Sequence, residues 1–226
     1  MQAQALTFAL PKGRILGPAT KLLRAAGFDL GEVGIAKDRR LMFDLPGGGR
    51  ALLVKPSDVP TYVEHGVADV GISGADTLRE HAHDLYEPVD LGIGACRLAV
   101  AEPEDRPAPL RRGMALRVAT KYPNSARRHY HSKGISPEII PLYGSVELGA
   151  ITGLADQIVD LVESGETLRQ NRLVEVETVM HVTSRLIVHP ASLKLKPGPV
   201  ARLIDELRAV VGQQETGEPR KAAGDR

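Results

Sequence analysis

The chain has 226 residues, enough for one large domain or two smaller ones, each with its own core. A net charge of +1 excludes the strong basic field expected of a nucleic-acid-binding or membrane-surface protein. The single cysteine, Cys96, excludes an internal disulfide and fits a reducing compartment. The sequence has neither an export signal nor an apolar run of the ~18 residues that a membrane span needs, so it predicts a cytoplasmic protein.

The first elements are a predicted strand over residues 6–10 and a predicted helix over residues 15–26. Between them lie Lys12, Gly13 and Arg14. Two cations around a glycine, at the carboxyl end of a first strand, suit the anionic oxygens of phosphate or pyrophosphate. The same residues would also fit an ordinary solvated basic turn.

Residues 39–45 and 51–55 read as two strands on either side of the glycines at 47–49. No helix starts after these glycines, so they predict a hairpin turn rather than a nucleotide-binding loop. Lys55 ends the second strand, where its side chain could face a ligand.

Residues 68–76 predict a short strand, a Gly/Ser turn and the start of another helix, preceded by a helix near residues 57–65. Ser73 and Gly74 in the turn, with Asp69 nearby, form a second candidate anion site.

Two long extended stretches, residues 91–101 and 173–188, look like crossings between lobes. They predict one domain from residues 1–93 and 179–211, and a second from residues 94–178. A strand at 116–120, a helix at 124–133 and an amphipathic helix at 199–211 complete the alternation of an α/β protein. The polar residues 212–226 predict a disordered tail.

The most informative stretch is a short apolar strand at residues 156–162, followed by a loop and a helix start. In the loop, Gly165 lets the backbone approach a ligand, and Ser164 and Thr167 offer hydroxyl donors to a phosphate. Asp160, just before the loop, is an acceptor suited to two adjacent ribose hydroxyls. Taken alone, a Ser-Gly-x-Thr turn also fits a simple helix cap.

The longer pattern resembles the signature of the ATP phosphoribosyltransferase family. Its spacing runs through Glu147, Gly153, Ile158, Asp160, Ser164, Gly165, Thr167 and Leu168. The opening LPKGR and the segments DVPTYVEHG and ADVGISGAD are also typical of that family. The resemblance covers nearly the whole chain from residue 6 to about residue 211.

The resemblance implies two lobes with mostly parallel sheets, like the type II periplasmic-binding-protein fold, and an active site in the cleft between the lobes. The chain is too short for the carboxyl-terminal regulatory domain of the family's long form, so it resembles the short form. Short-form enzymes self-associate as dimers and assemble, typically as a hetero-octamer, with a regulatory subunit related to histidyl-tRNA synthetase.

The implied reaction is the first step of histidine biosynthesis. Adenine N1 of ATP attacks C1′ of phosphoribosyl pyrophosphate with inversion, and Mg²⁺ is expected on the departing pyrophosphate.

The catalytic candidates are Lys12, Arg14 and Asp160. The candidates for phosphoribosyl pyrophosphate are Asp156, Asp160, Glu163, Ser164, Gly165, Glu166, Thr167 and Leu168. Those for ATP and pyrophosphate are Lys12, Gly13, Arg14, Lys55, Asp69, Ser73 and Gly74. Asp156 lies four strand residues before Asp160, or roughly 13 Å away, too far to share the same hydroxyls.

Two alternatives stay open at this point. One is a non-catalytic small-molecule binding protein with the same two-lobed fold, which the sugar-phosphate loop and the missing export signal disfavour. The other is an ordinary purine or pyrimidine phosphoribosyltransferase. Those enzymes carry paired acids directly before their loop, whereas Val159 precedes Asp160 here.

Overall fold

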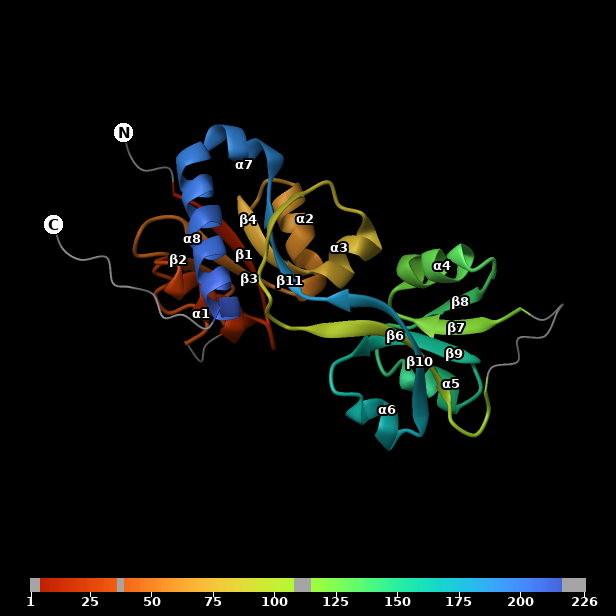
Figure 1. Ribbon diagram of the computed structural model, residues 1–226. Helices are drawn as coiled ribbons and strands as arrows, with labels where there is room; N and C mark the ends of the chain where they lie inside the picture. The colour runs from red at the N-terminus through yellow and green to blue at the C-terminus, as the bar shows by residue number, and fades with distance from the viewer. Residues whose placement is uncertain (1–4, 36–38, 108–114, 217–226) are drawn as a thin grey trace. The chain divides into compact units, whose positions relative to one another are not determined.

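The computed structural model describes residues 5–35, 39–107 and 115–216 (Figure 1). The chain divides into two compact units. Unit 1 comprises Met1–Leu78, His83–Gly94 and Thr183–Arg226, and unit 2 comprises Arg79–Ala82 and Ala95–Val182. The predicted second domain ends at residue 178, whereas unit 2 ends at residue 182, because its last strand runs unbroken to that residue.

Unit 1 is built on a six-stranded mixed sheet with the order β2-β3-β1-β4-β11-β5. Its central strand β1 is parallel to both β3 and β4, while β2, β11 and β5 pair antiparallel with their neighbours. The carboxyl ends of β1, β3 and β4 consequently lie at one edge of the sheet. The strands are β1 (Thr7–Pro11), β2 (Met42–Asp44), β3 (Arg50–Val54), β4 (Val70–Gly74), β5 (Tyr86–Asp90) and β11 (Ser184–Val188).

Helices cover both faces of this sheet. On one face, α1 (Leu16–Ala25) and α8 (Pro197–Thr216) bury apolar side chains at helical spacing against the strands, and Figure 1 shows these two helices alongside each other. On the other face, α2 (Val59–Glu64) and α3 (Ala75–His81) pack a smaller cluster. A 3₁₀ turn, η1 (Pro56–Asp58), leads into α2, and α7 (Pro190–Leu195) precedes α8.

Unit 2 contains a five-stranded mixed sheet with the order β10-β6-β9-β7-β8. Strands β9, β7 and β8 are parallel, β6 pairs antiparallel with β9, and β10 pairs antiparallel with β6. One face is covered by α4 (Pro123–Ser132) and the other by α5 (Glu147–Ile151) and α6 (Glu166–Gln170). The strands are β6 (Cys96–Pro103), β7 (Arg117–Thr120), β8 (Glu138–Pro141), β9 (Gln157–Val162) and β10 (Leu173–Val182).

The structure refines several predicted elements. Parallel pairing, expected for most strands from the alternation of strands and helices, is confined to three strands in each sheet. The stretch at 173–188 is two strands in different sheets, separated at Thr183. The predicted hairpin is confirmed, because β2 and β3 pair antiparallel around the glycines.

The expectation of disorder from residue 212 was wrong for residues 212–216, which continue α8. Gln and Glu are good helix formers, and a helix already nucleated by a packed apolar face extends readily through them. The remainder of the predicted tail, residues 217–226, lies outside the described residues. In the part of the chain that is described, no helix combines the length and apolar character of a membrane span.

Candidate active site

The loop after β9 forms a small pocket in unit 2. Strand β9 carries Asp160 to its carboxyl end, and the loop over residues 163–165 leads directly into α6. The pocket has a volume of about 240 Å³ and is lined by Glu147 and by each residue from 160 to 168. It therefore includes all the residues predicted for phosphoribosyl pyrophosphate except Asp156.

The loop has a backbone conformation that selects glycine. Gly165 has a φ of +78°, in the left-handed region that residues with a Cβ avoid. A Cβ placed there would come no closer than 3.9 Å to Val162, so the requirement comes from the backbone conformation and not from crowding. Ser164 Oγ accepts the Glu166 amide at 3.3 Å, and Thr167 is exposed in the first turn of α6. Both hydroxyl residues, Ser164 and Thr167, line the pocket.

Both ends of the loop are anchored in the fold. Leu168 is buried in the core of unit 2, so its predicted contribution to binding can come only from its backbone. Arg97 on β6 makes a bidentate ion pair with Glu175 on β10, at 2.8 and 2.5 Å. The same guanidinium donates from Nη1 to the carbonyl of Glu163 at 3.3 Å. Arg97 thus holds the start of the loop.

Asp160 lies in an environment that disfavours its charge. Burial raises the pKa of its carboxyl, and the nearby carboxylate of Glu147 raises it further. Hydrogen bonding from the Leu161 amide at 2.8 Å and the positive charge of Lys121 act in the opposite direction without cancelling the effect of burial. A partly desolvated carboxylate lining a pocket is the type of group that gains most from ligand hydroxyls.

Lys121 and Glu147 are additions that sequence reasoning missed. Lys121 follows β7 and Glu147 opens α5 after β8, and both strands are parallel to β9. The carboxyl ends of these strands meet at one edge, so the rule that parallel strands bring their carboxyl ends together could have found both residues. Just before α5, Ser145 has a φ of +48°, a left-handed conformation that is uncommon outside glycine.

Asp156, by contrast, lies at the amino end of β9, away from the loop. Its carboxylate accepts the Arg117 amide at 2.9 Å and the Arg117 guanidinium at 2.7 and 3.2 Å. Hydrogen bonding to Arg117 is the main reason that the pKa of Asp156 falls below its ordinary value. The structure therefore does not bring Asp156 together with the other predicted ligands, because the strand separates it from them.

In unit 1, the structure brings the predicted cations to neighbouring strand ends. Lys12, Gly13 and Arg14 follow β1, and Lys55 follows β3. The Lys12 amide donates to Val54 at 2.8 Å, so Lys12 and Lys55 leave the sheet side by side. Gly13 has a φ of +86°, and the side chains of Lys12, Arg14 and Lys55 are all exposed.

Ser73 and Gly74 are not in a turn, as the sequence predicted, but are the last two residues of β4. The apolar pattern continues to the strand end, and α3 begins immediately after it. A Cβ on Gly74 would lie 2.1 Å from Asp76 Oδ1, so a larger residue there would displace that carboxylate. Ser73 is buried.

Asp69 does not line this edge of the sheet. It precedes β4 and so lies at the opposite, amino end. Its carboxylate accepts the Thr7 amide at 2.8 Å, the Ser192 hydroxyl at 2.8 Å and the Lys196 ammonium at 2.7 Å. These contacts tie α7 and the start of α8 to the sheet, which corrects its assignment as a ligand of the nucleotide.

An Asp69→Ala variant is expected to lose about 2–4 kcal/mol of unfolding free energy. The substitution removes the carboxylate that accepts from the partly buried Lys196 ammonium and from two other donors, the Thr7 amide and the Ser192 hydroxyl. Its affinity for substrates is expected to stay at the wild-type level. Urea denaturation with parallel binding titrations measures both. The exposed Asp44 provides a control, since Asp44→Ala is expected to change stability by less than about 0.5 kcal/mol. Unchanged stability with weakened binding would return Asp69 to the ligand site.

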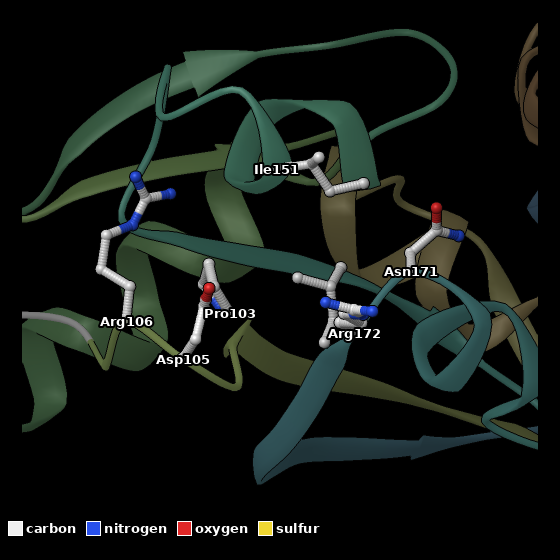
Figure 2. A pocket seen from close by; sticks show the side chains of 7 residues that line it. Pro103, Asp105, Arg106, Ile151, Asn171 and Arg172 are labelled. Atoms are coloured by element: carbon white, nitrogen blue, oxygen red, sulfur yellow. The ribbon is translucent and has the colours of Figure 1, made fainter.

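A second pocket in unit 2 lies at the other edge of its sheet, where Leu173 pairs with Pro103. It has a volume of about 220 Å³ and shares no residue with the loop pocket. Figure 2 shows Arg106 on one side and Asn171 and Arg172 on the other. Arg106 donates from Nη2 to the carbonyl of Ala150 at 2.8 Å, so one of its nitrogens is already engaged in a contact within the fold. None of the predicted site residues lies here, so the loop pocket remains the candidate site.

Comparison with known proteins decides the family. Residues 55–209 match the family model described as HisG: ATP phosphoribosyltransferase. The chain belongs to the ATP phosphoribosyltransferase family. The ATP phosphoribosyltransferase of Sorangium cellulosum is 52% identical over 205 residues, which cover 90% of this chain and 95% of that relative. The relative therefore has the length of the short form, as the sequence predicted.

Solved structures agree with this family assignment. The ATP phosphoribosyl transferase (HisG:HisZ) complex from Thermotoga maritima contains a chain that is 35% identical, with a TM-score of 0.78 and coverage of 92% of this chain and 99% of that one. A histidine kinase sensor domain described as similar to periplasmic binding proteins has a TM-score of 0.54 at 14% identity, covering 96% of this chain and 92% of its own. The second likeness concerns the fold alone, and it confirms the predicted two-lobed architecture. Members of the ATP phosphoribosyltransferase family are pentosyltransferases that act at the first step of histidine biosynthesis.

Proposed function

We propose that this chain transfers the phosphoribosyl group of phosphoribosyl pyrophosphate to N1 of the adenine of ATP, with inversion at C1′ and release of pyrophosphate. The observation that carries the proposal is the loop pocket of unit 2, where one continuous segment supplies a carboxylate, two hydroxyls and a glycine turn. In this assignment Ser164, Gly165, Thr167 and the backbone of Glu166 hold the 5′-phosphate. Asp160 accepts hydrogen bonds from the 2′- and 3′-hydroxyls of the ribose.

The carboxylate of Glu166 supports its assignment as a backbone ligand. It is engaged along α6 by Arg169 at 2.5 Å and by Gln170 at 2.7 Å. The hydrogen bond from Arg169, and to a smaller extent that from Gln170, lowers the pKa of Glu166. Both contacts keep its negative charge directed toward the helix surface. A phosphate can then meet the amide and hydroxyl donors of the loop without facing that charge directly.

The basic strand ends of unit 1 are assigned to the polyphosphates. Lys12, Arg14 and Lys55 would balance the charge of ATP or of the departing pyrophosphate, and Gly13 lets the backbone approach it. Adenine N1 carries an available lone pair and no proton that must first be removed, so the reaction requires no general base. Its demands are alignment of two polyanions and stabilisation of the leaving group.

Magnesium fits this assignment as an ion held chiefly by substrate oxygens. Among the described residues, no group of three or more His, Cys, Asp or Glu side chains could hold a metal ion. The negative charge of Glu147 raises the pKa of the Asp160 carboxyl, an arrangement that tolerates a nearby cation. Mg²⁺ when bound would offset charge on the pyrophosphate oxygens, usually with few protein ligands.

A regulatory partner belongs to the same proposal. The Thermotoga maritima relative was solved as a HisG:HisZ complex, and its chain is similar to this one along nearly its whole length. We propose that this chain dimerises and assembles, in the cytoplasm, with a subunit related to histidyl-tRNA synthetase into a hetero-octamer. Size-exclusion chromatography with light scattering, with and without the candidate subunit, measures this assembly.

A spectrophotometric assay of the purified full chain with ATP, phosphoribosyl pyrophosphate and Mg²⁺ tests the proposed reaction. Product formed by the chain alone, or only with the regulatory subunit, would support it. No product in either case, with ligand still bound, would favour the alternative of a non-catalytic binding protein with the same fold. Replacing ATP with free purine or pyrimidine bases separates this activity from that of an ordinary phosphoribosyltransferase.

A Thr167→Ala variant is expected to bind phosphoribosyl pyrophosphate about tenfold more weakly, because it removes one hydroxyl donor to the phosphate. Calorimetric titration measures the change. Thr152 is a matched control in unit 2, since its hydroxyl donates to the Leu148 carbonyl at 2.7 Å and lies outside the loop pocket. Equal affinity for the wild type and Thr167→Ala would contradict the placement of the phosphate.

A further inference from the structure

A row of polar side chains crosses three strands of unit 1. Ser73 on β4 is paired with Arg185 on β11, and Arg185 is paired in turn with Asp90 on β5. Directly opposed residues of antiparallel strands have Cβ atoms about 4.5–5.5 Å apart and project from the same face. The side chains of Ser73 and Arg185 therefore start from adjacent positions on one face of the sheet.

Two atoms in this row are buried donors without a partner. Among the described residues, the buried side-chain nitrogen and oxygen atoms that lack a hydrogen-bond partner are Ser73 Oγ, Arg185 Nε and His189 Nδ1. Two of these three belong to residues that are directly paired. Ser73 is only 2% exposed, so its hydroxyl has little access to bulk water. A buried donor left unsatisfied is costly, and two together point to a missing acceptor.

The orientation of the guanidinium is set by the third member of the row. Arg185 Nη2 makes an ion pair with Asp90 Oδ2 at 3.1 Å, and Asp90 Oδ1 accepts the Gly92 amide at 3.1 Å. This contact fixes Arg185 while leaving Nε available. A serine hydroxyl beside a guanidinium N–H favours an anionic oxygen, and phosphate oxygens suit such donors.

The row lies at the edge of the sheet where the predicted cations gather. Ser73 is the penultimate residue of β4, which runs parallel to β1, so it shares the carboxyl edge with Lys12. It also projects from the sheet face on which α2 packs, because a Cβ on Gly71, two residues earlier, would meet Val59 and Val63. Lys55 leads into that helix through η1.

We propose that Ser73 Oγ and Arg185 Nε together bind an anionic oxygen of a polyphosphate, with Asp90 as the positioning residue. This inference rests on the proposed function and deepens it, since it adds Arg185 and Asp90 to the site and gives Ser73 a defined role. The ligand group is the same whether the polyphosphate is ATP or pyrophosphate.

Calorimetric titration of the full-length protein with Mg²⁺–ATP and, separately, with Mg²⁺–pyrophosphate tests the subsite. Arg185→Gln is expected to weaken binding of at least one of these ligands by about tenfold to a hundredfold. Arg50→Gln removes a cation of the same unit at the amino end of β3, where its side chain pairs with Asp44, and is expected to leave both affinities unchanged.

Ser73→Ala gives a readout that a purely structural serine would not produce. Because it removes a buried hydroxyl without a partner, it is expected to raise the melting temperature of the unliganded protein. The same change is expected to weaken polyphosphate binding about threefold to tenfold. A structural serine would give the opposite sign, namely a lower melting temperature with unchanged affinity.

The outcomes separate the ligand sources and the two proposals. Weakened binding of ATP alone would assign the subsite to the triphosphate, and weakened binding of pyrophosphate would assign it to the leaving group. Unchanged affinity of Ser73→Ala and Arg185→Gln for both ligands would overturn the subsite, as would a wild type that binds neither. A wild type that binds polyphosphate through these residues but forms no phosphoribosyl-ATP would leave the subsite standing and refute the proposed function.

Discussion

Replacing Asp160 with asparagine is expected to weaken binding of phosphoribosyl pyrophosphate by about a hundredfold, because two charge-assisted hydrogen bonds to the ribose hydroxyls become neutral ones. At neutral pH the same variant is expected to unfold at a higher urea concentration than the wild type. The carboxylate occupies a position where burial and the charge of Glu147 oppose its ionisation, so the amide removes an unfavourable charge. Binding and stability therefore change in opposite directions.

The sign of the pH dependence follows from the raised pKa of Asp160 in the folded protein. Such a carboxyl contributes its full stability below its unfolded pKa, near 3.9, and loses that contribution as the pH rises through the folded pKa. The stability advantage of Asp160→Asn is accordingly expected at pH 7 and should vanish as the pH falls below about 4.

Urea denaturation of the unliganded protein at pH 7 and at progressively lower pH measures this effect, and calorimetry measures the affinity. The exposed Asp105 in unit 2 is the matched control, and Asp105→Asn is expected to change neither property. Wild-type affinity combined with lower stability at neutral pH would show that Asp160 supports the fold instead of the ligand.

The predicted site residues that the structure brings together most completely are those close together in the chain. The loop from residue 160 to residue 168 is one continuous segment, so a local pattern of strand, glycine and hydroxyls, together with the longer family signature, indicated it from the sequence. Lys12 and Lys55 were found in a different way, because each follows the end of a predicted strand, and the parallel pairing of β1 with β3 brings both to one edge of the sheet. Both kinds of inference need only the type of element and its approximate position.

The misplaced residues depended on strand boundaries. Asp69 and Asp160 are both acids next to short apolar strands, but Asp69 precedes β4 and Asp160 lies near the end of β9. Opposite ends of a strand lie at opposite edges of its sheet. An uncertainty of two or three residues in the strand boundary therefore decides whether an acidic side chain contacts the ligand or instead stabilises the fold. For Asp156 the sequence already indicated a position too far from Asp160 to share its ligand, and the structure places it at the opposite end of the strand.

The remaining features depend on pairing between distant parts of the chain. Arg97 and Glu175 are separated by 78 residues, and their contact arises from the register of β6 with β10. The pairing of Ser73 with Arg185 likewise follows from the register of β4 with β11. No local pattern specifies such a register, which is set by the burial of whole strand faces.

Asp156→Ala is expected to lower the free energy of unfolding by about 2–3 kcal/mol at pH 7 while leaving the affinity for phosphoribosyl pyrophosphate unchanged. The carboxylate accepts hydrogen bonds from the amide and guanidinium of Arg117, and its side chain is 18% exposed. Its loss would leave these donors without their partner. Urea denaturation measures the first effect and calorimetric titration the second.

The pH dependence of Asp156 is expected to have the opposite sign to that of Asp160. Its pKa is lowered in the folded state, mainly by the hydrogen bond from Arg117, so its contribution to stability is present above the unfolded pKa near 3.9. That contribution is lost as the pH falls through the folded pKa, and the wild type and Asp156→Ala should converge in acid. A double-mutant cycle with Arg117→Gln isolates the pair, because Asp156→Ala should cost much less in that background. Weakened ligand binding at unchanged stability would place Asp156 in the site after all. The expected result instead assigns separate tasks to two acids at opposite ends of β9: Asp156 stabilises the fold and Asp160 binds the ligand.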